Sequence, residues 1–378
     1  MIKNYEVTTF TSYKNKTFFD FEKTNYQMLL RTNVHGGILK GMMFVGPNAS
    51  GKSNSILAIK ILLDLLLGKN DVSLEGAMCL FSPNPTLSLK YTFQIDDAEI
   101  EYGFTYQRID KIITEKLCVN RQEVFSRNGS VASVFINEPI THTDVPSKTL
   151  FLRDVYFNTK FRGNIILQKW YEFLSNSVYF DLYSKKPISY KDVDLSLKTY
   201  LNENGTDRIN SFFEEYNFCQ RVEYDKTSRG NIVTMEAPEK MIFFKRHGID
   251  EPIPYQLESL GNITLINMLP AFFYCIENNG MLILDEFSSG FHNDLEELLV
   301  RYFMKNADRS QLIFVTHSTN LLTNSLMRPD QIYSVDFDND GSRIKKFSSE
   351  KPREAQNLEK MYLSGVFDGV PKYENNAE

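Results

Sequence analysis

The residues with the clearest chemical purpose lie in the segment Gly46–Ser53, GPNASGKS. This segment fits the phosphate-loop pattern G-x-x-x-x-G-K-S/T, and it follows an apolar run, Gly41–Val45, and precedes apolar residues at helical spacing. Glycine lets the backbone wrap closely around phosphates, the Lys52 ammonium can reach the β- and γ-phosphates, and the Ser53 hydroxyl can hold Mg²⁺. An ordinary Gly/Ser-rich turn would not explain why both flanks agree. The predicted nucleotide-binding residues are Gly46, Pro47, Asn48, Ala49, Ser50, Gly51, Lys52, Ser53 and Asn54.

A second group of chemical residues follows two short apolar runs. Met281–Leu284 ends in Asp285 and Glu286, and two adjacent carboxylates at a sheet edge are costly unless a cation or a proton transfer uses them. Beside a phosphate loop, Asp285 would hold Mg²⁺ with Ser53, and Glu286 would polarise the water that attacks the γ-phosphate. The alternative is an acidic turn at a strand end.

The run Gln311–Thr316 delivers His317 to the same predicted edge. An imidazole there can hydrogen-bond the γ-phosphate or the attacking water, although a lone histidine is more often a turn residue. The predicted catalytic residues are therefore Lys52, Glu286 and His317, the predicted metal ligands are Ser53 and Asp285, and the predicted cofactors are ATP and Mg²⁺.

The surrounding pattern predicts an α/β fold with a mostly parallel core sheet. Alternating apolar residues over 5–10 and 17–21 indicate strands, and apolar residues from Ile56 to Leu66 recur at helical spacing before Gly68. Strand-like runs separated by turns over 87–136 predict an antiparallel β subdomain. The predicted division is an N-terminal ATPase part at 1–136, an inserted lid at 137–225 and a C-terminal ATPase part at 226–378.

The lid is expected to be compact and mainly helical. Helices are predicted at 165–175 and 209–219, and no heptad repeat is sustained, which argues against a long coiled-coil arm. Aromatic side chains here, including Trp170, are more often core than a base-stacking surface.

Composition limits the class of protein. The chain has 378 residues, of which 42% are hydrophobic and 24% charged, typical of a globular protein. A net charge of −6 gives no overall attraction to nucleic acid, although it is compatible with a local basic groove. The four cysteines are far apart, which argues against a zinc site or disulfides and favours buried thiols. The N-terminus lacks secretory features and the apolar stretch Ile56–Leu67 is interrupted by charges, so a cytoplasmic protein without membrane spans is expected.

Several motifs together resemble a known family. They are GPNASGKSN at 46–54, ESLGN at 258–262, LILDEF at 282–287, SGFH at 289–292 and VTHSTNLL at 315–322. This set resembles ABC-type ATPases of the SMC/RecF-like group. More narrowly, with RPDQIYSVD at 328–336 and YLSGVFDGVP at 362–371, the chain is similar to AAA-family ATPases of bacterial anti-phage defence, of the abortive-infection AbiL and PARIS AriA kind. The resemblance covers roughly residues 1–120 and 230–373.

The resemblance implies that the signature segment, Glu258–Asn262, closes over nucleotide bound by another copy. Ser259 and Gly261 would then touch the γ-phosphate in trans, and the protein would be a homodimer or a higher oligomer. Asn262 stands where that family has threonine.

The resemblance also implies roles for residues outside the signature segment. Ser289 and His292 would make cross-subunit contacts. Gln94 is a weak candidate for the family's Q-loop glutamine, and Phe10 and Tyr13 could stack on adenine, although core strand positions suit them better.

Three functions remain open at this level. In the first, ATP-driven assembly controls a separately encoded effector, a nuclease or toxin, in anti-phage defence. In the second, the chain is a DNA-binding repair or chromosome-maintenance ATPase. In the third, it is a nucleotide-dependent scaffold with negligible turnover. The chain stops soon after YLSG, without the TOPRIM nuclease of related enzymes, and its five histidines form no HNH-like cluster. The expected effector is therefore another polypeptide, and acidity, a short lid and the resemblance favour the first function.

Overall fold

The centre of the protein is a seven-stranded sheet with the order β13-β12-β17-β18-β5-β19-β20. The computed structural model describes residues 1–68, 72–136, 138–181, 186–287 and 291–370. The five inner strands are parallel to one another, and the two edge strands are antiparallel. The prediction of a mostly parallel core sheet is therefore confirmed. The strand bounds are β5 Gly41–Val45, β12 Val178–Asp181, β13 Lys186–Ser189, β17 Met281–Asp285, β18 Gln311–Val315, β19 Ile332–Asp338 and β20 Gly341–Lys346.

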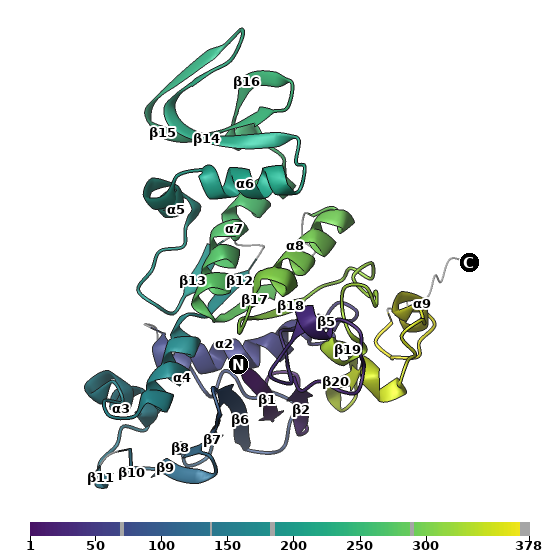
Figure 1. Cartoon of the computed structure of the whole chain (residues 1–378). Helices are drawn as coiled ribbons and strands as arrows, with labels where there is room; N and C mark the ends of the chain where they lie inside the picture. Colours follow the sequence, from purple (N-terminus) through teal and green to yellow (C-terminus); the bar gives the residue numbers. More distant parts are fainter. Residues whose placement is uncertain (69–71, 137, 182–185, 288–290, 371–378) are drawn as a thin grey trace.

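Helices cover both faces of this sheet, which explains why its inner strands are almost entirely apolar. Ile283 and Ile313 point into a core shared with α2 (Lys52–Leu67). Their neighbours Leu282 and Phe314 point into a second core, shared with α7 (Leu260–Asn278) and α8 (Asn293–Asn306). Figure 1 shows α2 on one side of the sheet and α7 and α8 on the other.

Among the described residues, α7 alone is long and apolar enough to cross a membrane. Its inner residues, such as Leu265 and Phe272, are completely buried against the second core. The length and composition of α7 are therefore accounted for by a core helix.

An eight-stranded sheet forms the antiparallel β subdomain that was predicted from residues 87–136. Its order is β11-β10-β9-β8-β7-β6-β1-β2, and every pairing is antiparallel. Two helices, α3 (Phe151–Thr159) and α4 (Ile165–Ser175), pack on its apolar face together with α2. The strand bounds are β1 Ile2–Thr8, β2 Thr17–Asp20, β6 Thr86–Ile95, β7 Ala98–Gln107, β8 Ile112–Val119, β9 Gln122–Asn128, β10 Val131–Val134 and β11 Ile140–His142.

The range 137–225 differs from the predicted inserted lid. It does contain helices, including α5 (Leu197–Asn204) and α6 (Asp207–Glu215), but these pack on α7 as part of the second core. It also contains β12, which pairs in parallel with β17 and so belongs to the central sheet. The lid prediction is wrong here because a four-residue strand flanked by helices carries no periodicity that reveals a partner about 100 residues later in the chain.

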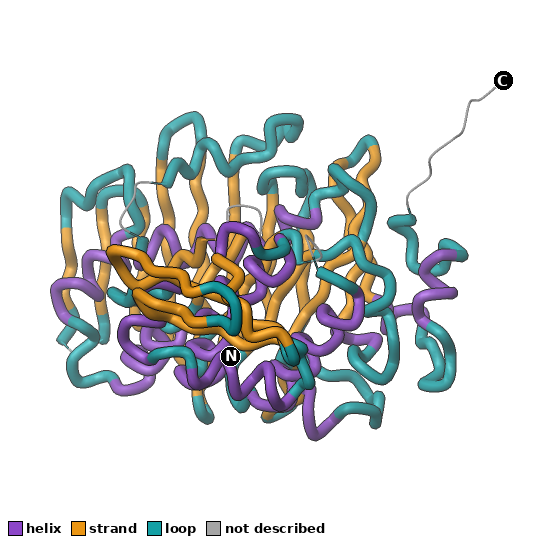
Figure 2. The backbone as a smooth tube through the Cα atoms, turned by 90° about the horizontal axis from the view of Figure 1, so that it is seen from above, coloured by secondary structure: helices purple, strands orange, loops and turns teal. Residues whose placement is uncertain are grey.

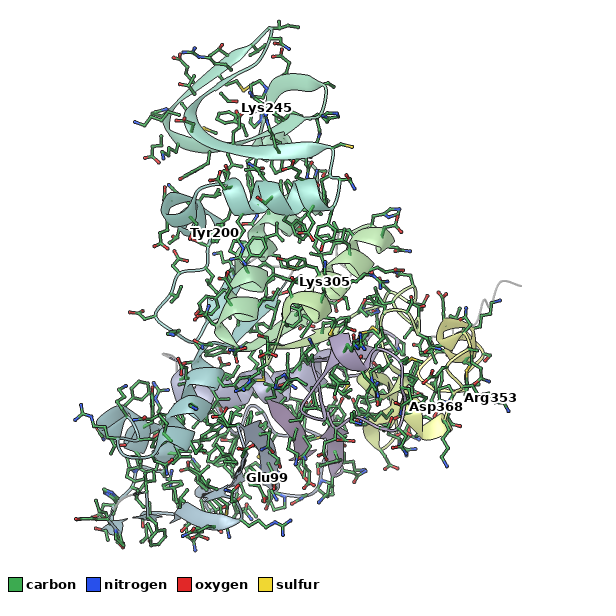
Figure 3. The ribbon with its side chains drawn as sticks, viewed as in Figure 1. Glu99, Tyr200, Lys245, Lys305, Arg353 and Asp368 are labelled. Carbon is green, nitrogen blue, oxygen red and sulfur yellow. The ribbon has the colours of Figure 1, made fainter. Side chains whose placement is uncertain are left out.

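The part that protrudes is a three-stranded antiparallel sheet of β14 (Gln220–Arg229), β15 (Thr234–Arg246) and β16 (Ile249–Pro254). It lies at the top of Figure 1, beyond α6, and nearest the viewer in Figure 2. Lys245, labelled in Figure 3, lies in β15 of this sheet.

The smaller elements complete the described part of the fold. They are α1 Leu30–Asn33, β3 Val34–His35, β4 Ile38–Leu39, α9 Leu358–Leu363 and three short 3₁₀ turns. The buried Arg328 pairs with Asp330 at 2.8 Å and donates to the backbone carbonyls of Tyr26 and Met28, which anchors the N-terminal part of the chain to β19.

All four cysteines are free thiols, and the sequence analysis had predicted no disulfide among them. Cys79, Cys118 and Cys275 are buried, but Cys219 is exposed, contrary to the expectation that all four are buried.

Candidate active site

The phosphate loop is a tight turn between β5 and α2, and its two glycines are required by its geometry. Gly46 has φ 155° and Gly51 has φ 98°. A side chain at Gly46 would collide with the carbonyl oxygen of Val335, and one at Gly51 would collide with the hydroxyls of Ser342 and Ser12. The turn therefore needs residues without a Cβ at both places.

Residues far away in the sequence form hydrogen bonds to the backbone of this loop. The Ser342 hydroxyl on β20 donates to the Ser50 carbonyl at 2.7 Å, and the Tyr13 hydroxyl donates to the Gly51 carbonyl at 3.3 Å. Phe10 and Tyr13 are both fully buried, so their role is in the core and neither is available to stack on adenine. Sequence reasoning missed Ser342, because a single serine on an edge strand carries no local signal.

Lys52 is the first residue of α2, and its ammonium folds back over the loop. Its Nζ donates to the Pro47 carbonyl at 2.7 Å. Burial lowers the pKa of Lys52 to about 8, although the nearby Glu286 and Asp285 carboxylates oppose this effect. A phosphate chain in the loop would supply the negative charge that this cation lacks.

Ser53 and Asp285 meet at the carboxyl end of β17. The Ser53 hydroxyl donates to Asp285 Oδ1 at 2.9 Å, and the Tyr179 hydroxyl on β12 donates to Asp285 Oδ2 at 3.1 Å. Burial raises the pKa of Asp285, while the two hydroxyl donors lower it and the Glu286 and Asp181 charges raise it further. Sequence reasoning missed Tyr179, because its strand was assigned to the lid.

This pair of oxygens suits a hard divalent cation. Within the described part of the chain, no group of three or more His, Cys, Asp or Glu side chains forms a complete metal cage. Mg²⁺ is commonly held by one or two protein oxygens, with water and substrate phosphates completing its shell. Ser53 and Asp285 fit that kind of site.

Glu286 and His317 lie next to each other beyond the ends of β17 and β18. His317 Nε2 is 3.4 Å from Glu286 Oε2. Glu286 has φ 57°, a left-handed conformation that is strained for glutamate and is typical of functional sites. Burial and the Lys52 ammonium lower the pKa of His317, and Glu286 opposes them. The net lowering of this pKa favours the neutral form of the imidazole.

A cavity of about 670 Å³ joins these residues to the phosphate loop. It is lined by Gly46, Pro47 and Asn48 of the loop and by Glu286 and His317. Three further lining residues, Thr319, Tyr362 and Leu363, were not predicted as site residues. Tyr362 and Leu363 belong to the YLSG motif, which carries the family resemblance but no predicted role at the site.

Comparison with known protein families identifies the family of the chain. Residues 42–323 match the family described as AAA domain, putative AbiEii toxin, Type IV TA system. The chain belongs to this AAA-domain family. No curated protein sequence matches the chain.

Solved structures show the fold of this AAA-domain protein. It is similar to the SMC head domain from Thermotoga maritima, with 17% identity, 91% of this chain and 97% of that chain covered and a TM-score of 0.49. An SMC head bound to the C-winged helix domain of ScpA gives 15% identity, 91% and 96% coverage and a TM-score of 0.53. A third similar structure is the Smc head domain with an extended coiled coil, bound to the C-terminal domain of ScpA derived from Pyrococcus furiosus. It has 14% sequence identity and a TM-score of 0.46, with 91% of this chain and 95% of that chain covered. The predicted P-loop fold of ABC type is confirmed.

The signature segment of this AAA-domain protein lies apart from its own phosphate loop. Ser259 is the N-cap of α7, and its side chain accepts from the Asn262 backbone N–H. Gly261 lies in the first turn of α7. The Asn262 amide donates to Gln220 Oε1 at 2.8 Å and Glu258 Oε1 at 3.0 Å, which anchors the segment beside β14. Neither Ser259 nor Gly261 lines the cavity that contains Glu286.

The remaining candidates are placed as follows. Ser289 lies outside the described residues, and His292 is the exposed N-cap of α8. Gln94 lies in β6 of the antiparallel subdomain, where its amide donates to the Asp96 carbonyl at 2.8 Å. Gln94 is not among the residues that line the cavity beside the phosphate loop, so the structure gives no support to Gln94 as a Q-loop residue.

Proposed function

We propose that this AAA-domain protein binds Mg·ATP and hydrolyses it to ADP and phosphate. The observation that carries the proposal is one cavity at which the phosphate loop, Glu286 and His317 meet, with the Ser53–Asp285 pair at its side. Residues that bind phosphate, hold a cation and accept a proton are the set that phosphoryl transfer to water requires.

Each residue then has a distinct role. The backbone of the loop and Lys52 hold the β- and γ-phosphates, and Ser53 and Asp285 would hold Mg²⁺, which neutralises charge on the phosphate oxygens. Glu286 accepts a proton from the attacking water as its oxygen bonds to the γ-phosphorus and the bond to the β-phosphate oxygen breaks. Neutral His317, beside Glu286, donates a hydrogen bond to the γ-phosphate or orients the water.

We also propose that two copies of the chain assemble around ATP, with Ser259 and Gly261 of one copy completing the site of the other. The support is geometric. The signature segment begins the long helix α7 with an exposed Ser259, and its neighbours Leu257 and Leu260 are 76% and 59% exposed. A helix N-terminus that presents backbone N–H groups and a hydroxyl is suited to a γ-phosphate.

The role of this assembly is proposed to be control of a separately encoded effector in anti-phage defence, in the cytoplasm. The description of the family as a putative toxin of a type IV toxin–antitoxin system supports a place in such a system. The likeness to an SMC head supports a second candidate, a DNA-binding maintenance ATPase. A scaffold with negligible turnover is the third, in which Glu286 only shapes the closed assembly.

The deciding experiment is mass measurement by light scattering on Glu286→Gln, with and without Mg·ATP. We expect the mass to double or more with Mg·ATP, because the substitution keeps the geometry of the site but removes the proton acceptor. Lys52→Ala is the control, since it loses the main cation for phosphate and should stay unassembled. Ser259→Arg should also block assembly while leaving ATP binding intact.

The same samples separate the candidates. Assembly that needs ATP but ignores a short DNA duplex supports effector control, and assembly or turnover that needs DNA supports the maintenance function. Wild-type turnover no faster than that of Glu286→Gln would contradict hydrolysis and leave the scaffold.

A further inference from the structure

The residues that follow β18 form a switch segment, Thr316–Asn320, that carries His317. It has left the sheet, and the backbone hydrogen bonds described for it are the Thr316 N–H to the Phe44 carbonyl at 3.1 Å, the Ser318 N–H to the Thr316 hydroxyl at 3.0 Å and the Leu322 N–H to the Thr319 carbonyl at 2.9 Å. The Asn320 side-chain amide also donates to the Asn293 carbonyl at 3.4 Å. A segment with so little regular backbone pairing needs side-chain contacts to hold its histidine in one place.

We propose that Glu359 on α9 is a positioning residue for His317, acting through Thr319. The Thr319 hydroxyl donates to Glu359 Oε1 at 2.6 Å. Thr319 is two residues from His317 and lines the same cavity. The proposal rests on the proposed hydrolysis of ATP and adds a residue to it that touches neither nucleotide nor water.

The helix that carries Glu359 is firmly anchored. Leu358 and Tyr362 of α9 are buried, and Phe347 stacks on Phe367 with ring centroids 3.7 Å apart. Lys345 of β20 donates to the Val366 carbonyl at 2.9 Å and pairs with Asp368 at 3.2 Å.

Figure 3 labels Asp368 and Arg353 in this C-terminal segment. The amide of Asn324 donates to the carbonyls of Glu354 and Gln356 at 2.7 and 2.8 Å. The segment that carries Glu359 is therefore bonded both to β20 and to a residue that follows the switch segment.

A second carboxylate, Glu296 on α8, also contacts the switch segment. Glu296 on α8 is 1% exposed; burial raises its pKa, while Ser318 and Asn320 lower it. The switch segment is thus held between α8, which follows Glu286 in the chain, and α9. Tyr362 and Leu363 of α9 also form part of the cavity wall.

This arrangement predicts which kinetic step depends on Glu359. The phosphate and cation contacts proposed above come from the phosphate loop, Lys52 and the Ser53–Asp285 pair. Glu359 makes none of them, although Tyr362 and Leu363 of the same helix line the cavity. Loss of the Thr319–Glu359 bond should therefore leave ATP affinity unchanged and release the switch segment, so that His317 is correctly placed for a smaller fraction of the time. A misplacement of about 1 Å at a reacting centre can lower a rate by about 100-fold.

The test uses the full chain with Thr319→Val and Glu359→Ala, which break the bond, and Thr319→Ser and Glu359→Gln, which keep a donor and an acceptor. Lys360→Ala, an exposed neighbour on α9, is the matched control. For the two breaking variants we expect kcat to fall by about 10- to 100-fold with unchanged affinity for a fluorescent ATP analogue. The two conservative variants and the control should remain within about threefold of the wild type, and the double variant Thr319→Val/Glu359→Ala should be no worse than either single one.

Hydrogen exchange of the peptide that spans residues 316–322 gives a second readout that needs no turnover. We expect its amides to exchange faster in Thr319→Val and Glu359→Ala than in the wild type, the control and Thr319→Ser. Breaking variants with wild-type kcat and wild-type exchange would overturn the positioning role while ATP hydrolysis stands. A wild type without turnover would overturn the proposed function, and the exchange result would then decide the positioning role by itself.

Discussion

Replacing Tyr179 by phenylalanine removes one hydroxyl and tests the cation site directly. That hydroxyl donates to Asp285 Oδ2, and Ser53 donates to the other carboxylate oxygen. The change leaves the ring in place between β12 and α2, where Lys60 Nζ lies 5.3 Å from the ring centroid. The variant therefore changes the electrostatics of Asp285 more than the packing around it.

The size of the effect follows from the geometry. A hydrogen bond to a charged group contributes about 1.5–3 kcal/mol, and the 3.1 Å separation of Tyr179 and Asp285 is long for a hydroxyl donor, so the lower end applies. A loss of about 1.5 kcal/mol in the orientation of Asp285 lowers Mg²⁺ affinity about tenfold. The pKa of Asp285, already raised by burial, rises further without this donor, so protons compete better with Mg²⁺.

The assay is ATP turnover as a function of Mg²⁺ concentration, at several pH values. We expect the half-saturating Mg²⁺ concentration to rise about tenfold at pH 8, more at pH 6, and kcat to recover at saturating Mg²⁺. Tyr190→Phe is the control, because the Tyr190 hydroxyl donates to Asp64 at 2.8 Å and does not reach Asp285. An unchanged Mg²⁺ dependence in Tyr179→Phe, or an equal shift in Tyr190→Phe, would refute the assignment of Asp285 as the cation ligand.

Three further predictions address the loop and the core. With a pKa of about 8, Lys52 is mostly neutral at pH 9 in the free protein, so ATP binding there should take up protons. Calorimetry in buffers of different ionisation enthalpy measures this uptake, and binding without proton uptake would contradict the pKa value. Gly51→Ala should abolish ATP binding and lower the free energy of unfolding by about 1–3 kcal/mol, because φ is 98° there and Ser342 occupies the space, as equilibrium binding and urea unfolding would show. Glu115→Gln should cost about 3 kcal/mol in urea unfolding, since it leaves the fully buried Arg127 without its counter-charge; a loss below about 1 kcal/mol would count against that pair as a buried ion pair.

Local sequence patterns were enough to predict one half of the candidate active site. The phosphate loop, Asp285, Glu286 and His317 each follow a short apolar run, and parallel strands bring their carboxyl ends to one edge of a sheet. The structure brings Glu286, His317 and the phosphate loop to one cavity, with Asp285 next to Glu286 in the chain, because β18 pairs with both β17 and β5 in the central sheet.

The other half depends on contacts that no local pattern encodes. Tyr179 and Asp285 are 106 positions apart in the chain. The Tyr179 hydroxyl reaches the Asp285 carboxylate because the four-residue strand β12 pairs with β17. Ser342, whose hydroxyl donates to the Ser50 carbonyl in the loop, lies on a β-strand 292 positions later in the chain. Glu359 resembles any exposed helical glutamate until the structure places it beside Thr319.

The protruding three-stranded sheet has a mechanical relation to the signature segment. Arg246, at the end of β15, pairs with Glu258 at 2.6 Å and donates to Gln220 of β14, and Gln220 in turn bonds to Asn262 of α7. A macromolecule that bound the three-stranded sheet and changed its orientation would, through these bonds, also reorient the first residues of α7. Coupling free energies are reciprocal. Binding of that helix end to nucleotide on a second copy would therefore change the affinity of the sheet for the macromolecule by the same factor as the macromolecule changes the affinity for nucleotide.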